Sequence, residues 1–231
     1  MQHSTHAAVA LRAVCAAYGP TTVLREVTAA VPARRVTALL GANGSGKSTL
    51  LGVVAGVHAP ASGAVERFHT ERPALVVQHS AVPDSLPVTV REAVAMGRWA
   101  HRGLWRRLTA ADRAIVADCM ERLGIADPAA RPLGSLSGGQ RQRTLLAQGL
   151  AQRSDLLLLD EPATSLDAAT QEAIPAIVED LCSDGVTVLH ATHDPQAARR
   201  ADHRLHLHEG RLAPEAAERE HRASADRGAA V

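Results

Sequence analysis

One short stretch constrains the fold of this chain more than any other. The run Val36 to Leu40, VTALL, is apolar and strand-like, and it leads directly into the glycine-rich sequence Gly41 to Thr49, GANGSGKST. After Lys47 the chain becomes apolar again up to Ala55, as in a helix. A strand, a loop of the form G-x-x-x-x-G-K-S and a helix, in this order, predict an α/β core that binds phosphate.

The loop combines the residue types that hold a nucleotide's phosphates. Its glycines allow tight turns, so that successive backbone N–H groups can point at phosphate oxygens, and the next helix adds its positive N-terminal end. Lys47 can reach the β- and γ-phosphates, and Ser48 can give a hydroxyl oxygen to Mg²⁺. We expect ATP to bind along the whole loop: Gly41, Ala42, Asn43, Gly44, Ser45, Gly46, Lys47, Ser48 and Thr49.

The composition sharpens this expectation at one position. Lys47 is the only lysine among 25 basic residues, and Asn43 is the only asparagine. A bias toward arginine has removed lysine everywhere else. We interpret its retention as a matter of shape, because a compact ammonium fits inside a ring of backbone amides and a planar guanidinium does not.

The totals exclude several classes of protein. A chain of 231 residues with 46% hydrophobic residues can bury a large core, and a net charge of +1 argues against a nucleic-acid binder acting through bulk charge. Three widely separated cysteines suggest no disulfide framework. The N-terminus shows no signal-peptide pattern, and no apolar run approaches the ~20 residues of a membrane span. We expect a soluble protein, or one attached to a membrane through a partner.

Apolar patterning predicts the remaining elements. The strands expected besides Val36–Leu40 are Val9–Val14, Val23–Val31, Ala74–Val77, Leu156–Leu159, Val186–Ala191 and Leu205–His208. The helices expected after Ala55 are Val88–Trp99, Thr109–Leu123, Gly138–Gln152 and Ala168–Cys182. Thr109 and Ser137 are the expected N-caps of two of them, and Pro175 is expected to distort or delay the last.

Two further motifs accompany the phosphate loop. Residues 136–140 spell LSGGQ at the start of a predicted helix, and residues 156–162 spell LLLLDEP. Together the three motifs closely resemble the nucleotide-binding subunit of ATP-binding-cassette (ABC) transporters, over roughly residues 9 to 212. The combination of LSGGQ between a phosphate loop and an apolar strand ending in Asp-Glu is highly specific.

The resemblance implies an α/β fold: a P-loop NTPase core with a mixed sheet, made of an N-terminal antiparallel part and a parallel core, and an inserted helical subdomain. No strand pattern interrupts the expected helices of the insertion. We place the core at 1–83 and 153–212, the helical signature subdomain at 84–152, and a loose tail at 213–231.

The acidic pair that ends the strand LLLLDE suggests the chemistry. Asp160 can hold Mg²⁺ directly or through water, and Glu161 is placed to polarise the attacking water as a general base. His193 follows a predicted strand and matches the family's switch histidine, which contacts the γ-phosphate. The competing interpretations are helix capping by the acidic pair and a purely structural histidine.

Two other positions take their roles only from the resemblance. Gln78 matches the family's Q-loop, which senses Mg²⁺ and the water and links the core to the helical subdomain. Tyr18, the only tyrosine, resembles the aromatic residue that stacks on adenine, a contact worth about 1–3 kcal/mol. The alternative for Tyr18 is an ordinary, partly buried side chain.

LSGGQ lies in a separate lobe from the phosphate loop, so the resemblance implies a head-to-tail homodimer. Ser137, Gly138, Gly139 and Gln140 would then bind the γ-phosphate held by the partner. Residues 164–167, which end at Asp167, match the D-loop that crosses the same interface.

The segment from Met96 to Arg113 is similar to that of bacterial metal-uptake ATPases of the zinc and manganese group. It predicts an importer subunit for zinc or, second, manganese, with a haem or iron-siderophore importer as the alternative. Such a subunit lies at the cytoplasmic face of the membrane, bound to integral permease subunits that receive cargo from an extracytoplasmic binding protein. Trp99 and Trp105 either help to form the groove for the permease or pack inside the lobe.

Another class of function stays open. Non-transport ABC ATPases of translation carry two cassettes, and those of DNA repair carry long coiled-coil insertions, whereas the ATPase of iron–sulfur assembly fits this length better. Three histidines near the last strand, His203, His206 and His208, could bind a metal. Exposed surface histidines are the simpler interpretation, since a transported ion never visits the ATPase in this family.

Overall fold

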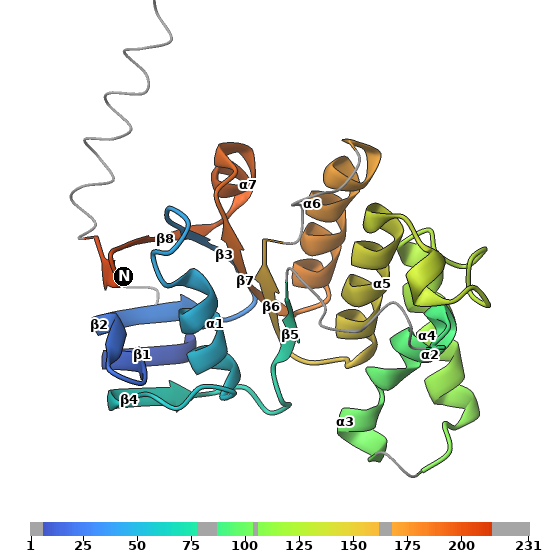
Figure 1. Ribbon diagram of the computed structural model, residues 1–231, viewed down its shortest axis with the longest axis horizontal. Coiled ribbons are helices and arrows are strands. Elements are labelled where there is room, and N and C mark those ends of the chain that lie inside the picture. The colour runs from blue at the N-terminus through green and yellow to red at the C-terminus, as the bar shows by residue number, and fades with distance from the viewer. Residues whose placement is uncertain (1–6, 78–86, 104–105, 162–167, 214–231) are drawn as a thin grey trace, which may run out of the picture.

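A computed structural model describes residues 7–77, 87–103, 106–161 and 168–213. Two sheets and a set of helices build the chain, and helix α1 (Lys47–Ala55) lies between the sheets (Figure 1). The predicted α/β fold with an antiparallel N-terminal sheet and a parallel core is confirmed. Gln78, Trp105 and the D-loop residues 164–167 lie outside the described residues, as does the tail from 214.

The N-terminal sheet is antiparallel, with the order β2-β1-β4. Its strands are β1 (Ala7–Tyr18), β2 (Thr21–Pro32) and β4 (Ser62–Arg67). The first two were predicted in shorter form. β4 was not predicted, because SGAVER carries too few apolar residues to show an alternating pattern.

The second sheet holds the phosphate loop. Its strands, in the order in which they lie across the sheet, are β5 (Ala74–Val76), β6 (Leu156–Asp160), β7 (Thr187–Thr192), β3 (Val36–Leu40), β8 (His203–His208) and β9 (Arg211–Leu212). All neighbours are parallel except β8 and β9. Both faces of the central strands are covered, which is why β6 and β7 are buried along their full length.

Helix α1 has almost no polar face because it packs on both sheets. Leu50, Leu51, Val53 and Val54 are fully buried in a core that joins β1 and β2 on one side to β6 and β7 on the other. The core therefore fixes the start of α1, and with it the phosphate loop, at the carboxyl edge of the parallel sheet.

The other helices lie on the opposite face of the parallel sheet (Figure 1). They are α2 (Val90–Met96), α3 (Trp99–Arg102), α4 (Ala110–Arg122), the 3₁₀ turn Leu133–Ser135, α5 (Gly138–Ala151) and α6 (Ala168–Ser183), while α7 (Pro195–Arg200) follows β7. One apolar core joins α2, α4 and α5 to β6 and α6. The domain boundaries at 84 and 152 stay predictions.

Two helix predictions need correction. The helix expected over Val88–Trp99 ends at Met96, and Gly97 follows it in close contact with α5, where a side chain would meet the backbone oxygen of Gln148. α6 runs through Pro175 as one helix. Its packing against the sheet through Ile174 outweighs the loss of one backbone hydrogen bond.

The predicted N-caps are confirmed. Thr109 and Ser137 each form a capping box with the residue three positions on, Asp112 and Gln140. The buried Asp112 also receives hydrogen bonds from Arg98 at 3.0 Å and from Arg102 at 2.8 Å. The bonds from Thr109, with those from the two arginines, hold the pKa of Asp112 well below its usual value.

Candidate functional site

The candidate site lies where two strands of the parallel sheet end. β3 leads into the loop from Gly41 to Gly46, and β6 leads into Glu161. Both strands pair with β7, so their carboxyl ends meet at one edge of the sheet (Figure 1). Loops at this edge are where open α/β sheets bind ligands.

The loop has little room for side chains. A Cβ at Gly41 would lie 2.3 Å from the backbone oxygen of Leu207, and Gly46 has a φ of 105°, which favours glycine. Gly46 is the N-cap of α1 and provides no side-chain cap, so no side chain caps the first turn of the helix. The loop therefore presents backbone donors at a positive helix end.

Ser45 shows that the loop is fixed and that one of its polar atoms lacks a partner. Its backbone N–H donates to the carbonyl oxygen of Ala42 at 3.1 Å, and its carbonyl oxygen accepts from the backbone N–H of Gly210 at 3.0 Å. The Ser45 hydroxyl is buried and has no hydrogen-bond partner among the described residues. Buried polar groups are normally satisfied, so this hydroxyl is an exception within an otherwise hydrogen-bonded loop.

Lys47 folds back over the loop and is only 5% exposed. Its Nζ donates to the oxygens of Gly41 and Ala42 at 2.8 and 3.2 Å, and lies 3.3 Å from Oε1 of Glu161. The lysine predicted to bind phosphate and the glutamate predicted to act as general base thus form a buried ion pair.

Glu161 joins the other side of the site. Its backbone adopts φ 46°, a left-handed conformation, while its N–H continues the sheet by donating to the oxygen of Ala191 at 3.0 Å. Its Oε2 lies 3.4 Å from Nδ1 of His193, a side chain that is 62% exposed. The strained backbone aims the carboxylate between Lys47 and His193, as is common at functional sites.

A cavity of about 380 Å³ opens at this edge. It is lined by Val23, Asn43, Gly44, Gly46, Lys47, Ser48, Thr49 and Glu161. Asp160, the last residue of β6, is buried directly before Glu161.

Sequence reasoning missed Val23. Its place on the strand after Tyr18, in the hairpin beside the loop, was the available signal.

Tyr18 lies at the end of the β1–β2 hairpin, paired with Thr21. It is 56% exposed, which is compatible both with a stacking role and with the ordinary, partly buried side chain of the alternative interpretation. Its ring contacts the ring of His58, a residue that sequence reasoning did not consider.

The LSGGQ residues lie elsewhere. Ser137, Gly138, Gly139 and Gln140 form the start of α5, on the opposite face of the sheet from α1, and none of them lines the cavity (Figure 1). Ser137 and Gly138 are exposed. Within one chain, the structure does not bring LSGGQ to the phosphate loop.

Sequence reasoning also missed His190. It lies on β7 three residues before His193, is 7% exposed, and its Nε2 has no hydrogen-bond partner among the described residues. Burial lowers the pKa of His190 to about 4, although Asp194 and Glu161 favour the charged form. A neutral ring therefore lies beneath the catalytic edge at neutral pH.

The residues proposed for Mg²⁺ have suitable chemistry. Ser48 offers a hydroxyl oxygen on the cavity wall and Asp160 a carboxylate at the strand end, and Mg²⁺ prefers oxygen ligands. In the described part of the chain, no group of three histidine, cysteine or acidic side chains is placed to hold another metal. The C-terminal histidines thus gain no support as a metal site.

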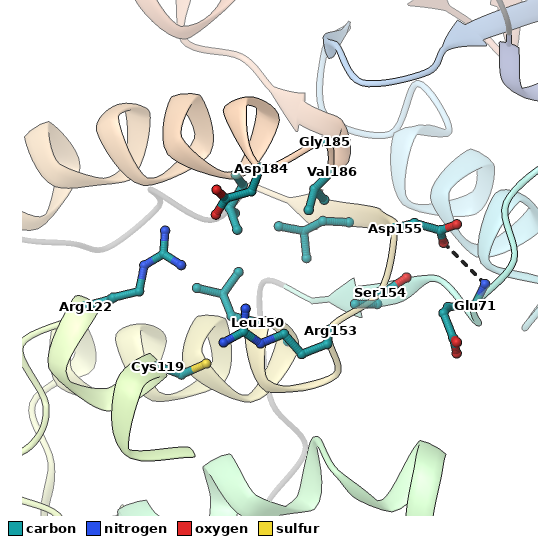
Figure 2. Close-up of a pocket in the computed structure, with 14 residues that line it drawn as sticks. Glu71, Cys119, Arg122, Leu150, Arg153, Ser154, Asp155, Asp184, Gly185 and Val186 are labelled. Atoms are coloured by element: carbon teal, nitrogen blue, oxygen red, sulfur yellow. Dashed lines mark hydrogen bonds between the residues drawn. The ribbon is translucent and has the colours of Figure 1, made fainter. Parts of the chain in front are cut away.

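A second cavity, of about 290 Å³, lies at the opposite, amino edge of the sheet (Figure 2). Arg122, Arg153 and Asp184 lie at its sides, and Asp155 is hydrogen-bonded to the backbone N–H of Glu71. Burial raises the pKa of the Cys119 thiol there to about 11, so the thiol stays protonated. No residue of the phosphate loop contributes to it.

Comparisons with known proteins agree with the geometry. The ABC transporter family model matches residues 24–164. The manganese transport ATP-binding protein MntB of Bacillus subtilis (strain 168) is 35% identical over 82% of this chain and 78% of its own. The ferric enterobactin transport ATP-binding protein FepC of Escherichia coli (strain K12) is 36% identical over 88% of this chain and 79% of its own.

Solved structures show the same fold. A metal-chelate type ABC transporter in an inward-facing conformation matches with a TM-score of 0.80 and 30% identity, over 90% of this chain and 82% of its own. An ATP-binding cassette solved as a dimer after hydrolysis, with ADP and phosphate bound, matches with a TM-score of 0.80 and 25% identity, over 89% of this chain and 97% of its own.

Proposed function

Because this chain belongs to the ABC transporter family of ATP-binding proteins, we propose that it drives the import of a metal ion or metal chelate by hydrolysing ATP as a head-to-tail homodimer. One observation carries the proposal. Lys47 of the phosphate loop, Glu161 and His193 converge at one edge of the sheet, although they come from three separate parts of the sequence.

ATP would bind along the cavity at the start of α1. The loop N–H groups and the helix end would hold the phosphates, with Lys47 between the β- and γ-phosphates. Tyr18, on the hairpin that also carries Val23, would stack on the adenine. The start of α1, which has no side-chain cap, supports phosphate as the ligand.

Binding would also prepare the base. Lys47 pairs with the Glu161 carboxylate at 3.3 Å. Phosphate oxygens compete for the same ammonium, so ATP would draw Lys47 away and leave Glu161 able to accept a proton from the attacking water. His193, beside Glu161, would orient that water and contact the γ-phosphate.

Mg²⁺ would be held by Ser48 and Asp160, with Gln78 as a third residue taken from the family pattern. When bound, the ion neutralises charge on the phosphate oxygens. The protein's own part is to fix the carboxylate oxygens of Asp160 at the strand end and the hydroxyl oxygen of Ser48 at the helix start.

A second chain would complete the site. The start of α5 is exposed and lies on the other face of the sheet from its own phosphate loop, so only another copy can offer Ser137 and the N–H groups of Gly138 and Gly139 to the γ-phosphate. Asp167 would cross the same interface. The dimeric cassette with ADP and phosphate supports this arrangement.

The cargo would be a metal, free or chelated. The relatives named above handle manganese and ferric enterobactin, and the matched transporter is of the metal-chelate type. Manganese and iron chelates are therefore equal candidates, and the earlier preference for zinc gains no support from these relatives. By the family pattern, the pathway would belong to integral permease subunits, fed by an extracytoplasmic binding protein. No helix among the residues described here is long and apolar enough to cross a membrane.

The test is uptake in a strain that lacks this gene. We expect loss of uptake of either manganese or a ferric siderophore, restored by the wild-type chain and not by Glu161→Gln, which keeps the fold but lacks the base. Normal uptake of manganese, ferric siderophore and zinc, with recovery of the chain on soluble scaffold proteins, would instead favour the non-transport class.

A further inference from the structure

Two aromatic rings from different parts of the sequence meet beside the nucleotide site. The ring centroids of Tyr18 and His58 are 4.6 Å apart and the ring planes are inclined by 32°. This is the spacing of an offset aromatic pair. Tyr18 comes from the β1–β2 hairpin and His58 from the loop between α1 and β4.

The two rings differ in burial. Tyr18 is 56% exposed although His58 covers part of it, so the other face of Tyr18 is open to solvent. His58 is half-buried, and its Nε2 is shielded without a hydrogen-bond partner in the described chain. His58 therefore lies beneath Tyr18 as the inner layer of the pair.

The backbone holds His58 firmly in this place. Its N–H donates to the oxygen of Gly52 in α1 at 3.1 Å, which closes the end of the helix. Three residues later, the N–H of Ala61 donates to the oxygen of Cys15 in β1 at 2.8 Å. The loop that carries His58 is thus fastened both to the phosphate-binding helix and to the strand that carries Tyr18.

We propose that His58 backs Tyr18 as the second ring of the adenine platform and so sets the affinity for the base of the nucleotide. It is a positioning residue, because it reaches adenine only through Tyr18. An exposed tyrosine at a hairpin end has several rotamers, and a ring packed beneath it reduces the entropy lost when adenine stacks on top. The inference rests on the proposed stacking of adenine on Tyr18.

The experiment measures binding of ATP and of tripolyphosphate, which has no base, by displacement of a fluorescent ATP analogue. His58→Ala should weaken ATP about three- to tenfold, the size expected when one ring of an aromatic pair is lost. Tripolyphosphate should bind unchanged. In turnover, KM for ATP should rise by the same factor while kcat stays the same. His58→Phe keeps a ring and should restore ATP binding to within about twofold.

A matched control is His203→Ala, at the amino end of β8 and away from the ring pair. It should leave both ligands unaffected. If His58→Ala binds ATP like wild type while Tyr18→Ala weakens it, the role of His58 is wrong and the adenine contact stands. If Tyr18→Ala has no effect, the adenine contact itself is wrong. Equal weakening of ATP and tripolyphosphate by His58→Ala would also overturn the inference, since the effect would then be structural.

Discussion

The starts of α1 and α5 are both proposed to bind phosphate, yet they are built differently. α1 begins at Gly46 without a side-chain cap, and its Lys47 is buried against Glu161, the proposed base. α5 begins at the exposed Ser137, whose hydroxyl oxygen accepts from the backbone N–H of Gln140. In return, the side-chain oxygen Oε1 of Gln140 accepts from the backbone N–H of Ser137. The first end therefore has no side-chain partner for its N–H groups, and the second provides its own.

This difference fits their proposed roles. An uncapped helix start inside a cavity has unsatisfied N–H groups that phosphate can bind in a single chain. A capped start on the surface keeps its shape while it waits for a phosphate carried by another molecule. The serine hydroxyl still has its own hydrogen to donate, because in the capping box it acts as an acceptor.

The largest effect should come from removing the Glu161 carboxylate, which faces Lys47 at the start of α1. Glu161→Gln removes the general base and should lower kcat by about 100- to 10,000-fold, since that is the usual contribution of a positioned base. ATP should still bind, because the phosphate loop is intact. Steady-state ATPase assays and nucleotide titrations check both parts. A turnover near wild type would remove Glu161 from this role.

The phosphate-binding part of α1 should be next. Lys47→Ala should weaken ATP binding by about 10- to 100-fold, the loss expected for a charge-assisted hydrogen bond. Lys47→Arg keeps the charge but not the compact shape, and should also lose turnover. Isothermal titration and ATPase assays measure the two effects. Full activity of Lys47→Arg would defeat the explanation for the only lysine in the chain.

The stability of the folded chain should depend on pH through His190, which lies on β7. His190, near Glu161, has a pKa of about 4 in the folded chain, below the usual 6.5 of an unfolded histidine. The unfolded state therefore binds more protons between these values, and stability falls as pH drops through this range. The wild type should lose about 1–2 kcal/mol more than His190→Leu between pH 7 and pH 5, by urea unfolding. Parallel losses in the two proteins would contradict the buried neutral ring.

The smallest effect should be on the cap of α5. Ser137→Ala should reduce stability by about 1 kcal/mol, whereas Ser137→Asn, which can also cap, should not. Both variants should lose ATPase activity, because neither offers the serine hydroxyl to the partner's phosphate. Thermal melts combined with ATPase assays separate the two roles. If Ser137→Asn were fully active, α5 would serve only as a capped helix.

The sequence predicts best what is local. β3, the loop and α1 lie within 20 consecutive residues, and their pattern alone predicted a strand, a loop and a helix in this order. The caps at Thr109 and Ser137 were equally visible, since a capping box is a short motif. The family pattern also selected Lys47, Glu161 and His193, which are distant in sequence and lie side by side in the structure; their roles stay predictions.

What the sequence does not show depends on contacts between distant segments. β4 forms because β1 offers it an edge, not because its own residues alternate. The need for glycine at Gly97, just after α2, comes from its close packing against α5. His190 and His58 look like ordinary histidines until the sheet register buries one ring and the hairpin stacks on the other. The left-handed backbone of Glu161 has no signal at all in its residue type.

The mass of the Glu161→Gln chain with and without Mg²⁺-ATP, by light scattering after gel filtration, tests the central claim most directly. The account predicts the mass of one chain without nucleotide and of two chains with it, because the ATP site at α1 is completed by α5 of a second copy. Ser137→Arg in the same background should bind ATP at its own α1 and stay a single chain. A Glu161→Gln chain that stays single when saturated with ATP, or a Ser137→Arg variant that still pairs, would contradict the composite site.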